Sequence, residues 1–300
     1  MTSYLNGAAY VLGEEELDHA DVTDLAERAA RYQLLPKPQL WGWGTVRRTR
    51  RPLAELAAAA GRAALSRAGL AASEVPALVL CSSSVSEPAE DHGAFFADVL
   101  TGIGLGPVPH YGLALNRCTN LLAGLDLADA LVRAGRYPRV LVVTADRVLD
   151  ERERLVGYAI FSDAAAAVVV DGRPAAGGFE LLGCASAQDT AALPAAAEIS
   201  AELARQVTDR LLAAPGLKPD ELCAVLTLNI FRPLVMVKER QAGSTADQLY
   251  LDNISRIGHC YAADPLINLL DRGSHPGHHY LLAASVPGSR HGALVRRLED

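Results

Sequence analysis

A single cysteine, Cys118, lies where an apolar run ends and a helical pattern begins, in "LNRCTNLLAGLDLADAL". Backbone amides at a helix N-terminus carry a partial positive charge, which stabilises a thiolate and can hold an oxyanion. Cys118 is therefore a candidate nucleophile. The alternative is a small buried hydrophobic residue, since unpaired cysteines are often buried.

His259 is the histidine best placed to act with that thiol. It follows Gly258 on a turn that precedes a second helical pattern, in "RIGHCYAADPLINLL". A nucleophile and its base are usually completed by a third group that orients the base, and Asp264 is a candidate for that group. Asp264 also precedes Pro265, which makes it a candidate N-cap of the following helix. Both interpretations of Asp264 stay open.

The remaining cysteines and histidines are weaker candidates. No two cysteines have a CxxC spacing, which argues against a disulfide framework and against a structural zinc site. The other cysteines lie in or beside apolar runs, where we expect them to pack. They are Cys81, Cys184, Cys223 and Cys260. The three histidines of "GSHPGHHY" have no carboxylate or cysteine among them, which favours a solvated loop over a metal site.

The elements that position these residues repeat along the chain. Aligning Gly69 with Gly216 pairs "LSRAGLAASEVPALVL" with "LAAPGLKPDELCAVLT" without a gap. Each copy follows a helical pattern and ends in an apolar run of strand length. We infer two βα halves, residues 1–172 and 173–300, that divide at a glycine-rich turn. The loops of Cys118 and His259 hold equivalent positions, so a pseudo-twofold packing would bring thiol and imidazole together.

Other elements follow from the same patterns. The first half predicts strands and one helix that lead to and from the nucleophile, and the second half predicts a looser copy. The expected strands are 113–115, 139–148, 164–172, 248–254, 279–286 and 292–298, and the expected helices are 118–136 and 260–272. The small residues of "FSDAAAAVVV" predict tight packing under the nucleophile loop.

Composition sets outer limits on function. The 300 residues carry a net charge of −7, which argues against a nucleic-acid partner. The basic run "RRTRR" is local. The N-terminus has no basic region followed by an apolar core, and no apolar run is long enough for a membrane span. These features, with scattered cysteines, predict a cytoplasmic α/β protein.

Several segments resemble β-ketoacyl-acyl-carrier-protein synthase III, of the thiolase fold. "LNRCTNLLAGLDLADALVRAGRYPRVLVVTAD" is similar to that family's nucleophile segment, and "AIFSDAAAAVVV" to its "FGDGAGA" segment. "SVPGSRHGALV" resembles its glycine-rich end. The resemblance implies a layered αβαβα arrangement, a twofold homodimer, and a cysteine that takes an acyl group from a coenzyme A or carrier-protein phosphopantetheine thioester. It implies no metal and no tightly bound organic cofactor.

The departures from the family's pattern bear on mechanism. The family's catalytic histidine falls at Leu228 or, after a slip of one residue, at Asn229, and its catalytic asparagine falls at His259. Pro287, in the glycine-rich end, has no amide hydrogen to donate. The pair of donors that the family uses for decarboxylation is therefore altered.

We favour an acyltransferase of secondary metabolism, with Cys118 as nucleophile and His259 as base for a hydroxyl or amine acceptor. One alternative is a decarboxylating synthase in which Asn229 and His259 replace the usual pair. Another is a non-catalytic subunit that pairs with an active partner. The four arginines of the run 47–51 are candidates to meet an acidic carrier protein, or form a solvated face.

Overall fold

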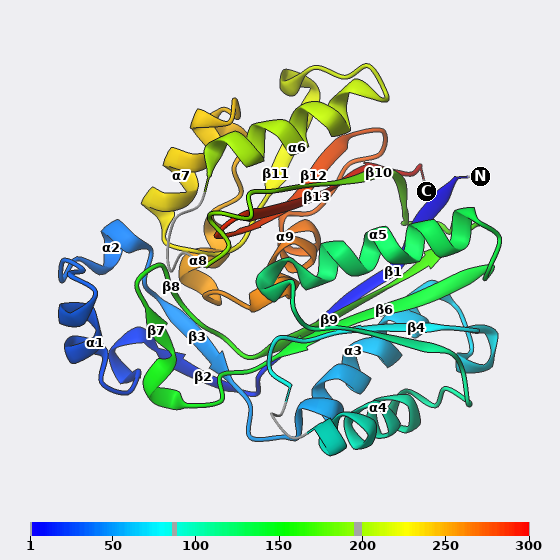
Figure 1. The fold of residues 1–300 in the computed structure, drawn as a ribbon, viewed down its shortest axis with the longest axis horizontal. Coiled ribbons are helices and arrows are strands. Elements are labelled where there is room, and N and C mark those ends of the chain that lie inside the picture. Colours follow the sequence, from blue (N-terminus) through cyan, green and yellow to red (C-terminus); the bar gives the residue numbers. More distant parts are fainter. Residues whose placement is uncertain (1, 86–88, 195–199, 300) are drawn as a thin grey trace.

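The computed structural model describes residues 2–85, 89–194 and 200–299. The strands of the main sheet are β1 (Ser3–Leu12), β4 (Leu78–Cys81), β5 (His110–Leu113), β6 (Arg139–Asp146), β9 (Ala164–Asp171), β10 (Phe179–Gln188), β11 (Leu222–Leu226), β12 (His279–Val286) and β13 (Ser289–Arg297). The helices packed on it are α3 (Leu53–Ala68), α4 (Ala89–Ile103), α5 (Asn120–Arg133), α6 (Ala201–Ala213), α7 (Arg232–Gln241) and α9 (Asp264–Arg272). Figure 1 shows five layers, with α3 and α4 outside one sheet half, α5 and α9 between the halves, and α6 and α7 outside the other. The predicted αβαβα layering is confirmed.

The sheet repeats its strand order on the two sides of its centre. The order is β11-β12-β13-β10-β1-β9-β6-β4-β5, and the sides meet where β1 pairs antiparallel with β10. On one side β4 runs parallel to β6, which pairs antiparallel with β9. On the other side β11 runs parallel to β12, which pairs antiparallel with β13. The duplication predicted from the sequence is therefore present in the topology.

The repeated segment uses the same residue types in both copies to turn from helix to strand. Gly69 and Gly216 follow α3 and α6 with left-handed φ values of 66° and 72°. Side chains are strained in that conformation, so glycine suits the end of each helix. Glu74 and Glu221 each accept a hydrogen bond from the backbone N–H three residues earlier, at 2.8 Å in both copies. These closed turns direct the chain into β4 and β11.

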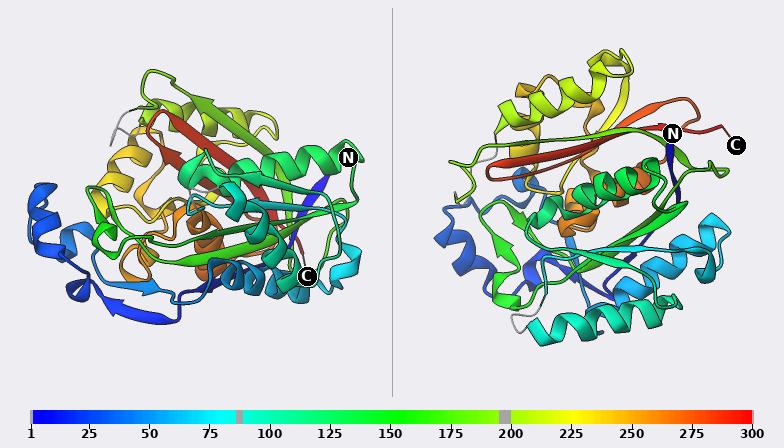
Figure 2. Two further views of the ribbon diagram at one scale, coloured as in Figure 1. Left: turned by 60° about the horizontal axis from the view of Figure 1, so that its bottom comes forward. Right: turned by 45° about the vertical axis from the view of Figure 1, so that its right-hand side comes forward.

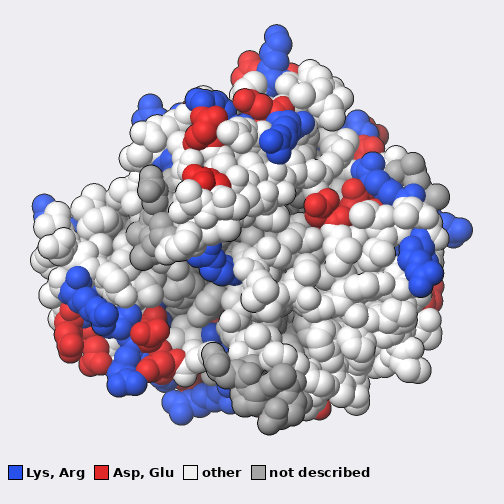
Figure 3. Space-filling model, viewed as in Figure 1, with Lys and Arg blue, Asp and Glu red and all other residues white. Residues whose placement is uncertain are grey.

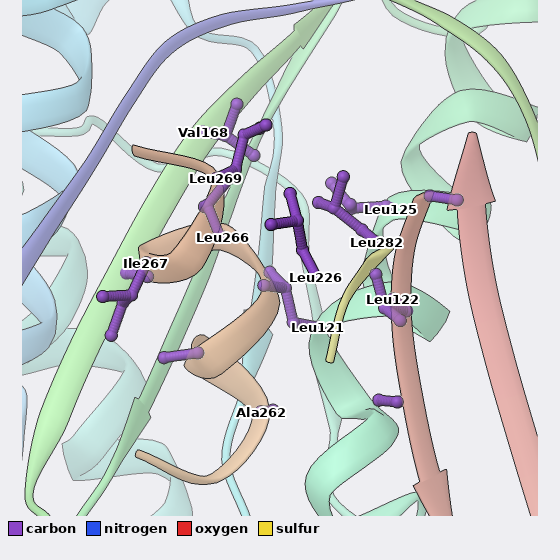
Figure 4. Close-up of a cluster of buried hydrophobic side chains, with 14 of the residues drawn as sticks. Leu121, Leu122, Leu125, Val168, Leu226, Ala262, Leu266, Ile267, Leu269 and Leu282 are labelled. Atoms are coloured by element: carbon purple, nitrogen blue, oxygen red, sulfur yellow. The ribbon is translucent and has the colours of Figure 1, made fainter. Parts of the chain in front are cut away.

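Helices α5 and α9 bury a shared apolar cluster in the middle layer. Leu121 and Leu125 of α5 lie across from Leu266 and Leu269 of α9, beside Leu282 of β12 (Figure 4). All five are at most 1% exposed, and burial of such apolar surface is the main favourable term in folding. Because this cluster takes side chains from both sides of the repeat, the division into residues 1–172 and 173–300 stays an interpretation.

The strand before the nucleophile lies earlier than the sequence predicts. We expected residues 113–115, but β5 ends at Leu113 and Leu115 is 96% exposed. Strand β5 is the last strand on its side of the sheet. Leucine at an exposed loop position gave the apolar pattern that we read as part of a strand.

The strand predicted at 248–254 is wrong. Leu249 forms one isolated bridge to Val225, and the short helix α8 (Asp252–Arg256) follows. Leu249 and Ile254 are both buried, one from a turn and one from the helix. Their spacing imitated a strand although the backbone forms no continuous ladder there.

A smaller group of elements lies beside the layers, at the side where α1 and α2 protrude in both views of Figure 2. It comprises β2 (Glu15–Asp18), α1 (Leu25–Arg31), α2 (Pro38–Trp41), β3 (Thr45–Arg48), β7 (Leu155–Val156) and β8 (Ala159–Ile160). Strands β2 and β3 form an antiparallel hairpin-like pair. Within the part of the chain that the structure describes, no helix has the length and apolarity of a membrane span.

Candidate active site

Cys118 lies in a 3-10 turn, Arg117–Thr119, that leads directly into helix α5. Arg117 has a left-handed φ of 52°. This conformation costs a non-glycine residue about 1–3 kcal/mol and is found where a site requires it. The turn leaves Cys118 8% exposed. Within the described residues its backbone N–H has no backbone partner, so this donor is free for an oxyanion.

The second half carries a matching turn. Tyr261 also has a left-handed φ of 52°, and the 3-10 turn Tyr261–Ala263 leads into α9 as the first turn leads into α5. Residue by residue, Cys118 matches Ala262. The turns contact each other across the middle layer. This packing brings His259, which precedes the second turn, to Cys118 in the first.

The backbone of His259 is hydrogen-bonded on both sides to the segment 160–162, at the end of β8. Its N–H donates to the carbonyl of Ile160 at 2.9 Å, and its carbonyl accepts from the N–H of Ser162 at 2.8 Å. Gly258 permits this approach, because a Cβ there would lie 2.8 Å from the same Ile160 carbonyl. The "FSD" segment, which we expected only to pack, therefore also fixes the position of His259.

Asp264 orients the imidazole. Its Oδ2 lies 2.5 Å from Nδ1 of His259 and accepts from the backbone N–H of Asn229 at 2.6 Å. Its Oδ1 accepts from the backbone N–H of Cys260 at 2.7 Å. All of these groups are buried. The carboxylate makes no capping hydrogen bond to α9, so of the two interpretations of Asp264 the geometry agrees with orientation of His259.

The charges around His259 favour its protonated form. Burial alone would lower the pKa of His259, but the negative charges of Asp264 and then Cys118 outweigh burial and raise the pKa to about 10. Its Nε2 is buried and has no hydrogen-bond partner of normal geometry among the described residues. The Cys118 sulfur is nevertheless close enough for its charge to act on the ring. Cys118, His259 and Asp264 thus form one electrostatically coupled group.

Asn229 belongs to the support of this group. Its Nδ2 donates to the Gly258 carbonyl and to Oδ1 of Asp264, both at 3.0 Å. Its Oδ1 accepts from Nδ2 of Asn268 at 3.0 Å. Both amide hydrogens of Asn229 are therefore engaged within the protein. Asn268 was not predicted, although its place one helical turn after Asp264 would have put it on the same face of α9.

Aromatic rings surround the thiol and the imidazole. The ring of Phe161 lies 4.7 Å from that of His259 and 4.4 Å from that of Tyr261. Tyr158 packs edge-on against Phe161. Burial, and then the charge of Cys118, raises the pKa of Tyr158, so its phenol stays protonated. Neither tyrosine hydroxyl has a hydrogen-bond partner within the described residues, which leaves two donors beside an apolar wall.

The turn between β12 and β13 contacts the nucleophile turn directly. The guanidinium of Arg117 donates to the carbonyl of Pro287 at 2.8 Å. Proline has no N–H, so this position supplies no hydrogen-bond donor. Any oxyanion in the site must instead rely on the Cys118 amide and on side chains.

A polar network supports the N-terminus of α5. Asn120, which is fully buried, donates to Oγ of Ser83 at 3.1 Å and accepts from the backbone N–H of Asn116 at 3.1 Å. The neighbouring carboxyl group of Asp146 accepts from the Ser83 N–H at 2.5 Å and from Oγ of Ser84 at 3.1 Å. Oδ2 of Asp146 is buried without a partner among the described residues.

The buried carboxyl group of Asp146 should make the free energy of unfolding depend on pH. Burial raises its pKa from 3.8 to about 7, despite the serine hydrogen bonds. A raised pKa stabilises the fold below the unfolded-state pKa, and this stabilisation is lost as the pH rises toward 7. Asn at position 146 does not titrate, so the Asp146→Asn variant does not lose this stability as the pH rises. Its unfolding free energy minus that of the wild type should therefore increase by roughly 2 kcal/mol between about pH 5 and about pH 8. Urea unfolding at both pH values measures this change, with exposed Asp220→Asn as the control. An unchanged difference would contradict the burial argument.

The arginines of the run 47–51 are already paired. Arg47 pairs with Glu16, Arg48 and Arg50 pair with Glu15, and Arg51 lies 3.8 Å from Glu14. On the face seen in Figure 3, basic side chains also lie beside acidic ones in clusters near the rim. The sequence did not show these pairs, because the glutamates 14–16 and the arginines lie about thirty residues apart along the chain. They meet only because β2 pairs with β3. The expectation that this run meets an acidic carrier loses its basis.

Comparison with known proteins agrees with this fold. The family model of 3-oxoacyl-[acyl-carrier-protein] synthase III matches residues 114–190, which include Cys118. The β-ketoacyl-[acyl-carrier-protein] synthase III of Rhodospirillum rubrum is 36% identical over 127 residues, which cover 41% of this chain and 38% of that relative. The matched stretch thus spans less than two fifths of the relative's length.

Two solved structures are similar over nearly the whole chain. The acyltransferase ChlB3 superposes with a TM-score of 0.85 at 20% identity, covering 100% of this chain and 98% of that one. The 3-oxoacyl-[acyl-carrier-protein] synthase III of Aquifex aeolicus superposes with a TM-score of 0.80 at 18% identity, covering 98% and 99%. The chain therefore has the thiolase fold. Its similarity in sequence to the synthase III family model covers residues 114–190, the part of the chain that contains Cys118.

Proposed function

We propose that this protein is an acyltransferase that carries an acyl group on Cys118 from a thioester donor to a hydroxyl or amine acceptor. The observation that supports this best is the contact between His259 and Asp264, whose Nδ1 and Oδ2 atoms lie 2.5 Å apart. The same imidazole lies close enough to the Cys118 sulfur for the thiol to affect its pKa. A cysteine, an oriented histidine and a carboxylate are sufficient for acyl transfer. No metal or bound cofactor has a part in the proposal, and the phosphopantetheine thioester enters as substrate.

The proton can be followed through each step. In the resting protein His259 carries a proton beside the Cys118 sulfur, whose thiolate attacks the thioester carbonyl. The imidazolium gives its proton to the departing thiolate, while the Cys118 amide holds the oxyanion. The acyl-enzyme removes the negative charge from sulfur, which lowers the proton affinity of His259. Neutral His259 then takes the proton of the acceptor as it attacks, and Cys118 leaves as a thiolate.

The engaged amide of Asn229 argues against decarboxylative condensation. That reaction needs two donors on the malonyl thioester carbonyl to hold the enolate as carbon dioxide leaves. Both N–H groups of Asn229 point to Gly258 and Asp264 instead. A silent subunit is also disfavoured, because it would not need a thiol coupled to a buried histidine and carboxylate.

The acceptor assignment is tested by single-turnover transfer. The protein is first acylated with an excess of acetyl or benzoyl thioester, freed of donor, and then mixed with a panel of amines and alcohols. We expect loss of the acyl mass from the protein together with an acylated acceptor, whose formation follows acceptor concentration. Loss of the acyl group to water at a rate that no acceptor changes would show a thioesterase and contradict the proposal.

A groove between α2 and α7 is our candidate for docking of the donor. A groove of about 740 Å³ is lined by Leu40, Met236 and Val237, with Arg232 and Arg240 among its polar residues. Neither arginine takes part in an ion pair within the described residues, and Nε of Arg232 is buried without a hydrogen-bond partner. Phosphopantetheine donors are anionic, so an apolar groove with free cations suits them. We propose that the donor docks here rather than on the run 47–51.

Charge reversal in this groove tests the donor site. Arg240→Glu should raise the KM for a carrier-protein donor about tenfold and leave kcat nearly unchanged, because the residue acts on docking alone. Arg50→Glu, which changes another exposed arginine that is already paired with Glu15, is the matched control and should change KM little. Equal effects of the two variants would place docking elsewhere.

We also propose a homodimer formed through the open edge of β5. This strand is the last in its sheet, and Leu115 next to it is 96% exposed. Unpaired strand edges and exposed leucines are features that a second copy can cover. Sedimentation should give a dimer, and Leu115→Asp should shift it toward monomer. A wild-type monomer at micromolar concentration would contradict this pairing.

A further inference from the structure

The histidine-containing loop 273–278 contacts a second thiol, remote from the proposed active site. Nδ1 of His278 lies 3.3 Å from Sγ of Cys223, and the guanidinium of Arg272 lies 3.5 Å from the same sulfur. Cys223 is at the beginning of β11, whereas Asn229 and the active site lie beyond the end of that strand. We expected Cys223 to pack, but it is partly exposed and has polar partners.

The partners of Cys223 are a cation and a proton acceptor. A guanidinium beside sulfur stabilises negative charge, and an imidazole can accept the thiol proton. Within the described residues Arg272 has no carboxylate partner; its contacts are the backbone carbonyls of Cys223 and Gly273 and the face of the Tyr280 ring. Its charge is therefore available to an anion that reaches the thiol.

The surroundings of three other cysteines raise the pKa of their thiols. Burial raises the pKa of Cys81 and of Cys260, and both are at most 1% exposed. Burial, followed by the charges of Asp126 and Asp129, raises the pKa of Cys184. These three thiols are held protonated. Cys184 is partly exposed like Cys223, but two carboxylates act on it, whereas Cys223 has a guanidinium and an imidazole in contact with its sulfur.

The same cluster does not have the composition of a metal site. Among the residues that the structure describes, no group of three or more His, Cys, Asp or Glu side chains is arranged to hold a metal ion. Arg272 contacts the sulfur from one side, where a metal would bring two like charges together. An anionic, thiol-reactive partner suits the cluster better than a cation does.

We propose that Cys223 is a thiol-modification site that exchanges with anionic low-molecular-weight disulfides. The thiol gives its proton to Nδ1 of His278, and the thiolate attacks one sulfur of the disulfide. A new S–S bond forms to Cys223 as the original S–S bond breaks, and the second half of the reagent leaves as a thiolate. Arg272 binds the carboxylate of the incoming disulfide. The reaction needs no oxidant besides the disulfide itself, and it does not depend on the chemistry at Cys118.

Reaction of the full-length protein with the dianionic disulfide 5,5′-dithiobis(2-nitrobenzoate) tests this site. Release of the coloured thiolate gives the rate, and peptide mass mapping gives the modified residue. We expect Cys223 to react about tenfold faster than a cysteine in an unstructured peptide. Arg272→Met should remove most of that advantage, and His278→Ala should slow the reaction further. Arg62→Met, an exposed arginine far from Cys223, is the control and should react as wild type.

A measurement without any variant guards against misfolding of the mutants. Attraction by Arg272 is screened by salt, so the wild-type rate should fall severalfold as the Debye length shrinks from about 30 Å to about 8 Å. Cys223→Ser should abolish the mapped modification and leave acyl loading of Cys118 unchanged. An unmodified Cys223, or a rate that neither salt nor Arg272→Met changes, would overturn the proposal.

Discussion

Cys118→Ala should gain no acyl mass when the protein is incubated with an acyl thioester, whereas the wild type gains one acyl group per chain. The thiol is the atom that forms the covalent bond, and among the described residues no other nucleophile is coupled to His259. Intact-protein mass spectrometry measures the increment directly. We expect the loss to be complete within the sensitivity of the measurement.

The control for this result is a cysteine that is reachable but not catalytic. Cys223→Ser removes the partly exposed thiol beside His278 and should load as wild type does. If Cys118→Ala still gained an acyl group that mapped to Cys223, that group would report surface chemistry only. An acyl group on any other residue of Cys118→Ala would contradict the nucleophile assignment.

His259→Ala should retain acyl loading but release the acyl group slowly. Without the imidazole nothing accepts the proton of the attacking hydroxyl or amine, and general-base catalysis is typically worth about 10²–10⁴-fold in rate. Quenched-flow mass spectrometry of the pre-formed acyl-enzyme measures the decay. The variant should therefore accumulate acyl-enzyme under conditions in which the wild type shows little.

The effect of orienting the imidazole can be measured separately from the effect of removing it, with Asp264→Asn and His259→Ala. Asp264→Asn keeps the size of the side chain but removes the charge that raises the pKa of His259, so transfer should fall less than in His259→Ala. His278→Ala, which changes an exposed histidine far from the site, should transfer at the wild-type rate. Equal transfer by wild type and His259→Ala would show that the base is another group.

The meeting of Cys118 and His259 could be predicted because it follows from the duplication. Two similar halves place equivalent loops at one interface, and the sequence shows the repeat through Gly69, Gly216 and the glutamates that follow them. The layered fold followed from the same repeat and from the family resemblance. Helix α9 and strands β12 and β13 also lie close to their predicted positions.

The support of the site could not be predicted, because it depends on contacts between segments distant in sequence. Whether Leu228 or Asn229 falls beside the histidine depends on a shift of one residue in register. The structure places Asn229 there, and Asn268 from another element fixes its amide. Nothing in the composition of the chain indicates which of Leu228 and Asn229 lies beside His259.

The same limit applies to charge. The arginines 47–51 formed an exposed basic run in the sequence, whereas in the fold Glu14, Glu15 and Glu16 neutralise them. Conversely, Cys223 gave no sign of its surroundings, because Arg272 and His278 reach it from a helix and a loop about fifty residues further on. Sequence patterns describe neighbours along the chain, and these ionic contacts are neighbours in space only.

Reaction with a malonyl thioester tests the central claim, transfer by a Cys118–His259–Asp264 group without decarboxylation, most directly. The mass of the acyl group on the protein and the carbon dioxide released are recorded in one experiment. We predict that the malonyl group reaches Cys118, or an acceptor, with its carboxylate intact and that carbon dioxide stays at the level of the Cys118→Ala control. Carbon dioxide released in proportion to the malonyl thioester consumed would show a condensing enzyme and contradict the account.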